Sequence, residues 1–284
     1  TPLRAPADLI EKYAAKAGVE VGAPADPADF GDEEQVWPRD EPRRVREVQN
    51  HAVYAAMVET LDTSVGRVLD RLDALDLAEN TIVVFFSDNG GLSTAEGSPT
   101  SNLPLRGGKG WLYEGGIREP MIVRWPAVAS AGDVTAAPVI STDFYPTLLE
   151  AAGVDVPLGI EVDGSSFLDL LRGGEAGENA AAVASERDLF WHYPHYGNQG
   201  GFPGGAIARG RYKLVERYED GQVHLYDLDA DVGERNDLAA EQPERVAEMR
   251  ARLHAWYGEV GARFLSALPD GPEPWRPAET SAAP

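Results

Sequence analysis

The sequence predicts an α/β fold followed by a small antiparallel sheet that is capped by one helix. Two observations lead to this prediction. First, a long amphipathic segment and a short turn precede an apolar run at residues 81–86, and helix followed by buried strand is the repeating unit of an α/β sheet. Second, several short runs typical of strands between residues 186 and 228 are followed by an amphipathic helix at 243–260.

The composition is that of a globular protein. The 284 residues are 43% hydrophobic and 25% charged, which is ordinary for such proteins. This length suits one large domain with an appendage. We therefore expect a main α/β unit over residues 1–185, an antiparallel subdomain over 186–265 and a flexible tail over 266–284.

The charge and the missing cysteines exclude several classes of function. A net charge of −22 argues against nucleic-acid binding, whose footprint is basic, and against steering of highly sulfated polymers by the global field. With no cysteine, the chain can form neither disulfides nor thiolate metal sites. No apolar run approaches the roughly 20 residues of a transmembrane helix. The oligomeric state does not follow from the sequence.

The first third of the chain predicts two helices. Residues 8–14 form a short amphipathic segment, whereas residues 19–42 are rich in Pro, Asp, Glu and Gly and predict an exposed loop. From residue 43 to about 77, apolar residues recur at helical spacing: Met57, Leu61, Val65, Val68, Leu72 and Leu75. His51, at the start of this helix, is expected to have a structural or solvent-facing role.

The middle of the chain alternates strands and helices. The run at 81–86 has no polar alternation, which favours a strand buried on both faces, as in a parallel sheet. A long polar loop at 92–105 is of the kind that is functional or mobile, and a second strand is expected at 120–125. A helix at 144–152 follows, with Thr142 or Asp143 as N-cap and Gly153 after its end.

The last third predicts the antiparallel unit. The Gly/Ala/Glu-rich residues 173–184 suggest a linker. Strands are expected at 188–191, 206–209, 211–218 and 223–228, with a hairpin turn at Asp220-Gly221.

Two polar residues follow the first predicted strand directly. Asp88 and Asn89 offer a carboxylate and an amide oxygen at the strand's carboxyl end, where open α/β sheets place their ligands. Hard cations such as Ca²⁺ or Mg²⁺ take oxygen ligands of this kind. Asp-Asn-Gly is also ordinary turn chemistry, so these residues alone leave both interpretations open.

A glycine-rich loop carries one of only four lysines in the chain. Lys109 stands in Gly107-Gly108-Lys109-Gly110, where its ammonium and nearby backbone N–H groups could meet an anion. The spacing is not that of a phosphate-binding P-loop, because no Ser or Thr follows the lysine.

The order of these motifs carries a resemblance. SDNGG, PLRGGKG and YEGGIREP, followed by STDFYPTLLEAAG, DGSSFLDLL and LYDLDADVGERNDLA, closely resemble the C-terminal half of type I sulfatases, within the alkaline-phosphatase-like superfamily. The resemblance covers the chain to about residue 264. It implies that residues 1–185 are part of an alkaline-phosphatase-like sheet sandwiched by helices.

The same resemblance implies a sulfuric ester hydrolase that cleaves aryl or carbohydrate sulfates. Asp88 and Asn89 would ligate Ca²⁺, with Mg²⁺ possible, and Lys109 would act in catalysis and bind the sulfate. The family's nucleophile is a formylglycine made from a Cys/Ser-x-Pro-Ser/Ala-Arg motif; the serine at Ser101 has one residue too many before Arg106. We therefore expect that the nucleophile lies in an N-terminal half outside this chain and that the chain alone is inactive. The resemblance also implies a periplasmic or secreted protein.

A loop rich in aromatic residues is a further candidate for substrate contact. His192 and His195 stand in WHYPHYGNQGG, where Pro194 argues against a helical zinc-binding pair. Aromatic and amide groups on a glycine-rich loop suit a sugar or aryl group. The alternative is an aromatic anchor that packs this loop onto the main sheet.

Two other functions are compatible with the residues. One is hydrolysis of phosphate or phosphonate esters by a member of the same superfamily, which a bare Thr or Ser nucleophile would indicate. The other is a non-catalytic protein that only binds a sulfated small molecule or glycan.

Overall fold

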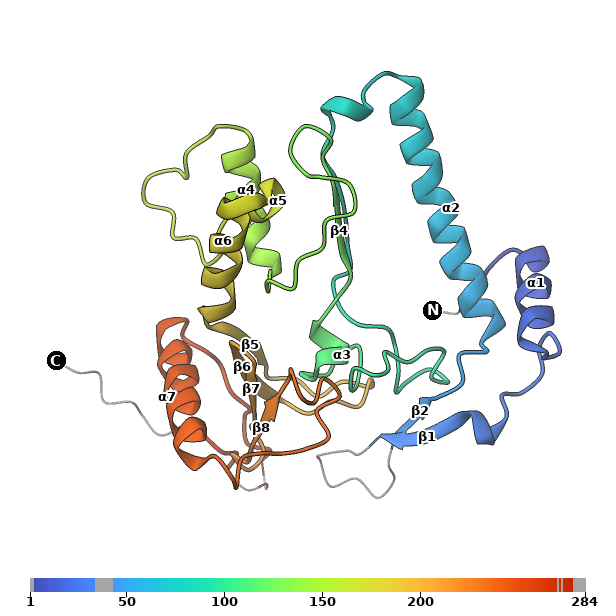
Figure 1. Cartoon of the computed structure of the whole chain (residues 1–284). Helices are drawn as coiled ribbons and strands as arrows, with labels where there is room; N and C mark the ends of the chain where they lie inside the picture. The colour runs from blue at the N-terminus through green and yellow to red at the C-terminus, as the bar shows by residue number, and fades with distance from the viewer. Residues whose placement is uncertain (1–2, 34–42, 270, 272, 278–284) are drawn as a thin grey trace.

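The structure is a computed structural model that describes residues 3–33, 43–269, 271 and 273–277. Within these ranges the chain forms three separate sheets, each antiparallel, with helices around them (Figure 1). No helix in the described ranges is long and apolar enough to cross a membrane.

The N-terminal part is a helical pair beside a two-stranded ribbon. Helices α1 (Ala7–Ala17) and α2 (Ala52–Ala74) pack against each other, and β1 (Phe30–Glu33) pairs with β2 (Arg43–Arg46) (Figure 1). The expected loop at 19–42 thus contains a strand, and its residues 34–42 lie outside the described ranges. The helix predicted from residue 43 begins at Ala52, because residues 43–46 are held in cross-strand pairs that override local helix preference.

His51 is the N-cap residue at the observed start of α2. Its ring Nδ1 accepts a hydrogen bond from the Tyr54 N–H at 3.2 Å, which satisfies one of the free donors in the first turn of α2. The structural role expected for His51 is therefore confirmed.

The two central strands are antiparallel rather than parallel. β3 (Val83–Phe86) pairs with β4 (Met121–Arg124), since the 34 residues between them return the chain to the same edge. The prediction that β3 is buried on both faces is wrong for this chain: Val84 and Phe86, two residues apart on β3, are 39% and 38% exposed. A short run of apolar residues has no polar–apolar alternation, so its sequence does not show which of its faces other elements cover.

Three helices follow this ribbon: α4 (Phe144–Ala151), α5 (Leu168–Arg172) and α6 (Gly174–Glu186). The expected linker at 173–184 is wrong, because its Ala and Glu residues have high helix propensity and form α6. Asp143, predicted as a cap, is buried and accepts hydrogen bonds from the Ile140 and Ser165 N–H groups.

The C-terminal sheet has the order β5-β6-β7-β8 and is covered on both faces. Its strands are β5 (Leu189–Tyr193), β6 (Gly204–Arg209), β7 (Tyr212–Arg217) and β8 (Val223–Asp227). Ile207, Leu214 and Leu225, which lie opposite one another on β6, β7 and β8, pack against α7 (Pro243–Glu259), as the strands-then-helix pattern predicted.

The opposite face of this sheet receives a segment from the middle of the chain. Trp111, Leu112 and Tyr113 form one buried cluster with side chains that include Ala206 and Val215. This segment begins at Trp111, only two residues after Lys109. The segment directly after the lysine loop is therefore packed against the C-terminal sheet.

Candidate functional site

A cavity of about 610 Å³ brings the predicted site residues together. Asp88, Asn89 and Lys109, which are up to 21 positions apart in sequence, all line it. Its remaining lining includes Tyr54 and Glu96. The structure thus collects one carboxylate, one amide and one ammonium group around a single space.

The loop after β3 places Asp88 and Asn89 through close backbone contact. The Gly90 N–H donates to the Gly116 carbonyl at 3.3 Å, and a Cβ added to Gly90 would lie 1.8 Å from the Gly115 carbonyl oxygen. Only glycine permits such an approach. The Asp-Asn-Gly turn is therefore packed against the short helix α3 (Glu114–Ile117).

The lysine loop is held by similar contacts. The Lys109 N–H donates to the Gly91 carbonyl at 3.1 Å, and a Cβ at Gly108 would lie 2.3 Å from that carbonyl oxygen. Gly107 and Gly110 adopt φ of +71° and +85°, the left-handed region that favours glycine. Within the described ranges Lys109 has no ion-pair partner, and its side chain is exposed.

Asn102 ties the two loops to each other. Its Oδ1 accepts from the Gly91 N–H, and its Nδ2 donates to the carbonyls of Gly91 and Gly107, each at 3.0 Å. One side chain thereby sets the separation between the loop of Asp88 and the loop of Lys109. Sequence analysis did not identify Asn102, since it bears no catalytic chemistry of its own.

Glu119 is a second residue that the sequence analysis missed. It lines the cavity, and its Oε1 is buried without a hydrogen-bond partner among the described residues. Burial, followed by the charge of Asp88, raises the pKa of Glu119 to about 7. Two mutually repelling carboxylates at one wall of a cavity are an arrangement that a bound cation would relieve.

This donor set fits a hard cation in kind but is sparse in number. Asp88, Asn89 and Glu119 offer only oxygen donors, which Ca²⁺ and Mg²⁺ prefer. However, no cluster of three or more acidic or histidine ligands occurs in the part of the chain that the structure describes. These residues could therefore supply part, but not all, of a coordination sphere.

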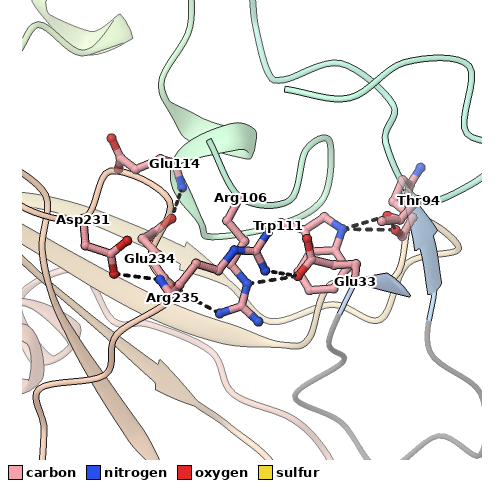
Figure 2. A network of polar contacts seen from close by, with 9 residues as sticks. Glu33, Thr94, Arg106, Trp111, Glu114, Asp231, Glu234 and Arg235 are labelled. Atoms are coloured by element: carbon pink, nitrogen blue, oxygen red, sulfur yellow. Dashed lines mark hydrogen bonds and ion pairs between the residues drawn. The ribbon is translucent and has the colours of Figure 1, made fainter. Parts of the chain in front are cut away.

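An ionic network that is largely buried includes Arg106, just before the lysine loop (Figure 2). Arg106, three residues before Lys109, donates to Glu33 Oε1 at 3.0 Å and to the Glu234 carbonyl at 3.1 Å. Arg235 also approaches Glu33, at 3.4 Å. The network thus joins β1, the lysine loop and the segment after β8.

A second part of this network reaches the C-terminal sheet. Lys213, on β7, is fully buried and contacts Glu114 Oε1 at 3.0 Å and Glu234 Oε1 at 2.9 Å. Glu234 also accepts from the Glu114 N–H at 2.6 Å, at the start of α3 (Glu114–Ile117). Burial raises the pKa of Glu234, and the charge of Lys213 opposes that rise.

The two predicted histidines do not share the cavity. His192 Nδ1 is 2.6 Å from the Tyr218 hydroxyl and its Nε2 is 2.9 Å from the Arg263 carbonyl, so both ring nitrogens are engaged within the C-terminal unit. Burial lowers its pKa. His195 is exposed and stands edge-on to Tyr193. Neither histidine is among the described residues that line the cavity, which favours the anchor interpretation for His192.

The same loop reaches the cavity with a different residue, Gln199. Its carbonyl accepts hydrogen bonds from Thr94 Oγ1 and, at 3.2 Å, from Trp111 Nε1. The aromatic residues of the loop made it a candidate for substrate contact, whereas no motif in the sequence distinguishes the amide of Gln199.

Comparison with known proteins yields a consistent result. The family model described as Sulfatase matches residues 2–154, and a second, described as N-sulphoglucosamine sulphohydrolase, C-terminal, matches residues 108–259. Together they cover both the cavity and the C-terminal sheet.

Curated relatives include a sulfatase of Formosa agariphila, 40% identical over 226 residues, and the steryl-sulfatase of Mus musculus, 33% identical over 262 residues. These matches cover 72% and 80% of this chain but only 39% and 40% of the relatives. The chain thus corresponds to about two fifths of their length.

Solved structures agree in fold. Ps i-CgsB in complex with k-i-k-neocarrahexaose matches 90% of this chain and 47% of its own, with 23% identity and a TM-score of 0.67. A protein crystallised with its substrate D-glucosamine-2-N,6-O-disulfate matches 74% of this chain and 40% of its own, with 27% identity and a TM-score of 0.57. On the family match over more than half of its length, the chain belongs to the sulfatase family.

Proposed function

We propose that the protein of which this chain is part hydrolyses sulfuric esters of aryl or carbohydrate alcohols, and that Lys109 stabilises the departing oxygen. The main observation in support of the proposal is that Asp88, Asn89 and Lys109 line the same cavity. Family membership supports the reaction class.

Asp88 and Asn89 are the residues we propose as ligands of Ca²⁺, or of Mg²⁺. A divalent cation supplies positive charge against the sulfate oxygens. The acidic lining by itself would repel sulfate, because Asp88, Glu96 and Glu119 outnumber Lys109 in the cavity. We place the formylglycine nucleophile of the family outside these 284 residues, since the chain has no cysteine and the serine candidate, Ser101, has one residue too many before Arg106.

Lys109 is suited to act on the leaving group. Its backbone is fixed by the Gly91 carbonyl, and its exposed ammonium is free of ion pairs among the described side chains. A preorganised cation stabilises the negative charge that develops on the bridging oxygen as the S–O bond breaks. This interaction is stronger in the transition state than in the ground state.

The test is Lys109→Ala in the complete enzyme, with kcat and KM measured on a sugar sulfate. Losing one such donor is expected to lower kcat by on the order of 10²–10³ with a smaller change in KM. Lys109→Arg should recover only part of the rate, because a planar guanidinium does not replace a compact ammonium. The defect should be smaller on nitrophenyl sulfates, whose leaving groups need less help.

Lys16→Ala is the matched control, since Lys16 is an exposed lysine far from the cavity lining. If Lys109→Ala retained the kcat of this control on the sugar sulfate, Lys109 would be a solvated loop charge and the proposed role would be refuted.

A further inference from the structure

We propose that Gln199 contacts the leaving group and selects hydroxyl-bearing alcohols, such as sugars, over aryl alcohols that lack hydrogen-bonding groups. This inference rests on the proposed sulfatase function. Gln199 lies on the loop between β5 and β6 and lines the cavity that contains Lys109.

The backbone of Gln199 is fixed by hydrogen bonds from buried side chains. Its carbonyl accepts from Thr94 Oγ1 and Trp111 Nε1, and Trp111 Nε1 also lies 2.9 Å from Thr94 Oγ1 (Figure 2 shows the Trp111–Thr94 contact). Thr94 and Trp111 are only 4% and 3% exposed. Arg43 donates to the neighbouring Asn198 carbonyl at 2.7 Å. Three residues distant from the loop in sequence, Arg43, Thr94 and Trp111, therefore hold it in place.

The side chain of Gln199 lies against the lysine loop. A Cβ added to Gly110, the residue after Lys109, would be 2.9 Å from Gln199 Cβ and 3.6 Å from its Oε1. Gly110 thus leaves room for this side chain beside the backbone of the lysine loop.

The amide of Gln199 is available for a ligand. No hydrogen bond occupies its side chain among the residues that the structure describes, although the carbonyl of the same residue has two donors. An amide offers two N–H donors and one acceptor without charge. This suits the hydroxyl groups of a sugar, which both donate and accept, and gives a phenyl ring no polar partner.

The acidic lining supports the same substrate class. Glu96 lines the cavity at φ +53°, an uncommon conformation for a residue other than glycine, and it is not among the oxygen donors assigned to a cation. Carboxylates accept hydrogen bonds from hydroxyl groups and repel additional sulfates. The leaving group that fits this wall is therefore a neutral sugar rather than one with a second sulfate close by.

The experiment compares two esters in the complete enzyme: N-acetylglucosamine 6-sulfate and 4-nitrophenyl sulfate. Gln199→Leu keeps the approximate size of the side chain and removes its hydrogen bonds. We expect the ratio of kcat/KM for the sugar sulfate to that for the nitrophenyl ester to fall by on the order of 10–100-fold, the effect of one or two hydrogen bonds. Gln199→Asn, which keeps the amide but shortens the side chain, should fall between parent and Leu.

Thr94→Val is the matched structural control, because it removes a bond to the Gln199 carbonyl and leaves the amide in place. Its effect should fall on both esters alike. Equal losses on both esters for Gln199→Leu, or no loss on either, would overturn the substrate contact. A parent enzyme that hydrolyses neither ester would overturn the proposed function itself, and with it this inference.

Discussion

Removal of the Lys213 ammonium tests whether the buried ionic cluster stabilises the protein. Lys213 is 0% exposed and lies about 3 Å from both Glu114 and Glu234, so Lys213→Met leaves two buried carboxylates without their cation. Breaking a buried pair in this way costs about 3–5 kcal/mol. At roughly 2–4 °C per kcal/mol for a chain of this size, the melting temperature should fall by about 6–20 °C.

The assay is thermal unfolding followed by circular dichroism at pH 7. Lys12→Met is the matched control, because it removes a lysine from an exposed ion pair with Glu59, and exposed pairs contribute little. Lys213→Met/Glu234→Gln should recover part of the loss, since it removes one unpaired charge and keeps an acceptor for the Glu114 N–H.

The effect should depend on pH in a defined direction. Burial raises the pKa of Glu234 above its ordinary value of 4.5, and loss of Lys213 removes the charge that opposes this rise. A carboxyl with a raised folded-state pKa loses stability as pH increases through that pKa. The gap between variant and parent should therefore widen from pH 4.5 toward pH 8. If Lys213→Met melted no lower than Lys12→Met at pH 7, the cluster would not have the role we assign to it.

Two further predictions concern the metal and the exposed apolar surface. The chain should bind Ca²⁺ weakly, because Asp88 and Asn89 fall short of the 6–8 oxygens that Ca²⁺ takes; tight stoichiometric binding in calorimetry, abolished by Asp88→Ala, would reveal further ligands. The chain should also self-associate through exposed apolar residues such as Val68 on α2 and Ile122 on β4, which are 60% and 64% exposed. Light scattering on the eluted peak measures this, and Val68→Lys/Ile122→Lys should shift the mass toward that of a monomer, whereas a monomeric parent would contradict the prediction.

Much of the fold was predictable because its signals are local. The stripe on α2, the hairpin at Asp220-Gly221 and the alternation in β6 to β8 each follow from periodicity or turn chemistry within a few residues. The pairing of β1 with β2 and the antiparallel contact of β3 with β4 depend on residues distant in sequence. The linker predicted in place of α6 has a different cause: the interpretation gave more weight to the local glycines than to the alanines and glutamates, which favour a helix.

The candidate site was predictable only for residues that stand in recognisable motifs. Asp88, Asn89 and Lys109 were named from the sequence, and the structure collects them around one cavity. Asn102 acts through bonds to the backbone of Gly91 and Gly107. Gln199 is placed by bonds from the side chains of Thr94 and Trp111 to its own carbonyl, and neither kind of bond leaves a pattern along the chain. His192 was conspicuous because it is aromatic and titratable, yet its two nitrogens are used inside the fold.

The glycine contacts between the loops restrict how this site can change through mutation. Added Cβ atoms at Gly90, Gly108, Gly115 and Gly116 would each lie 1.8–2.5 Å from a backbone carbonyl oxygen, and backbone cannot rotate away as a side chain can. Every single substitution at these positions would force the loops apart. A library that seeks new ester preferences should therefore keep the four glycines and randomise Tyr54, Glu96 and Gln199, whose side chains face the cavity without supporting its walls.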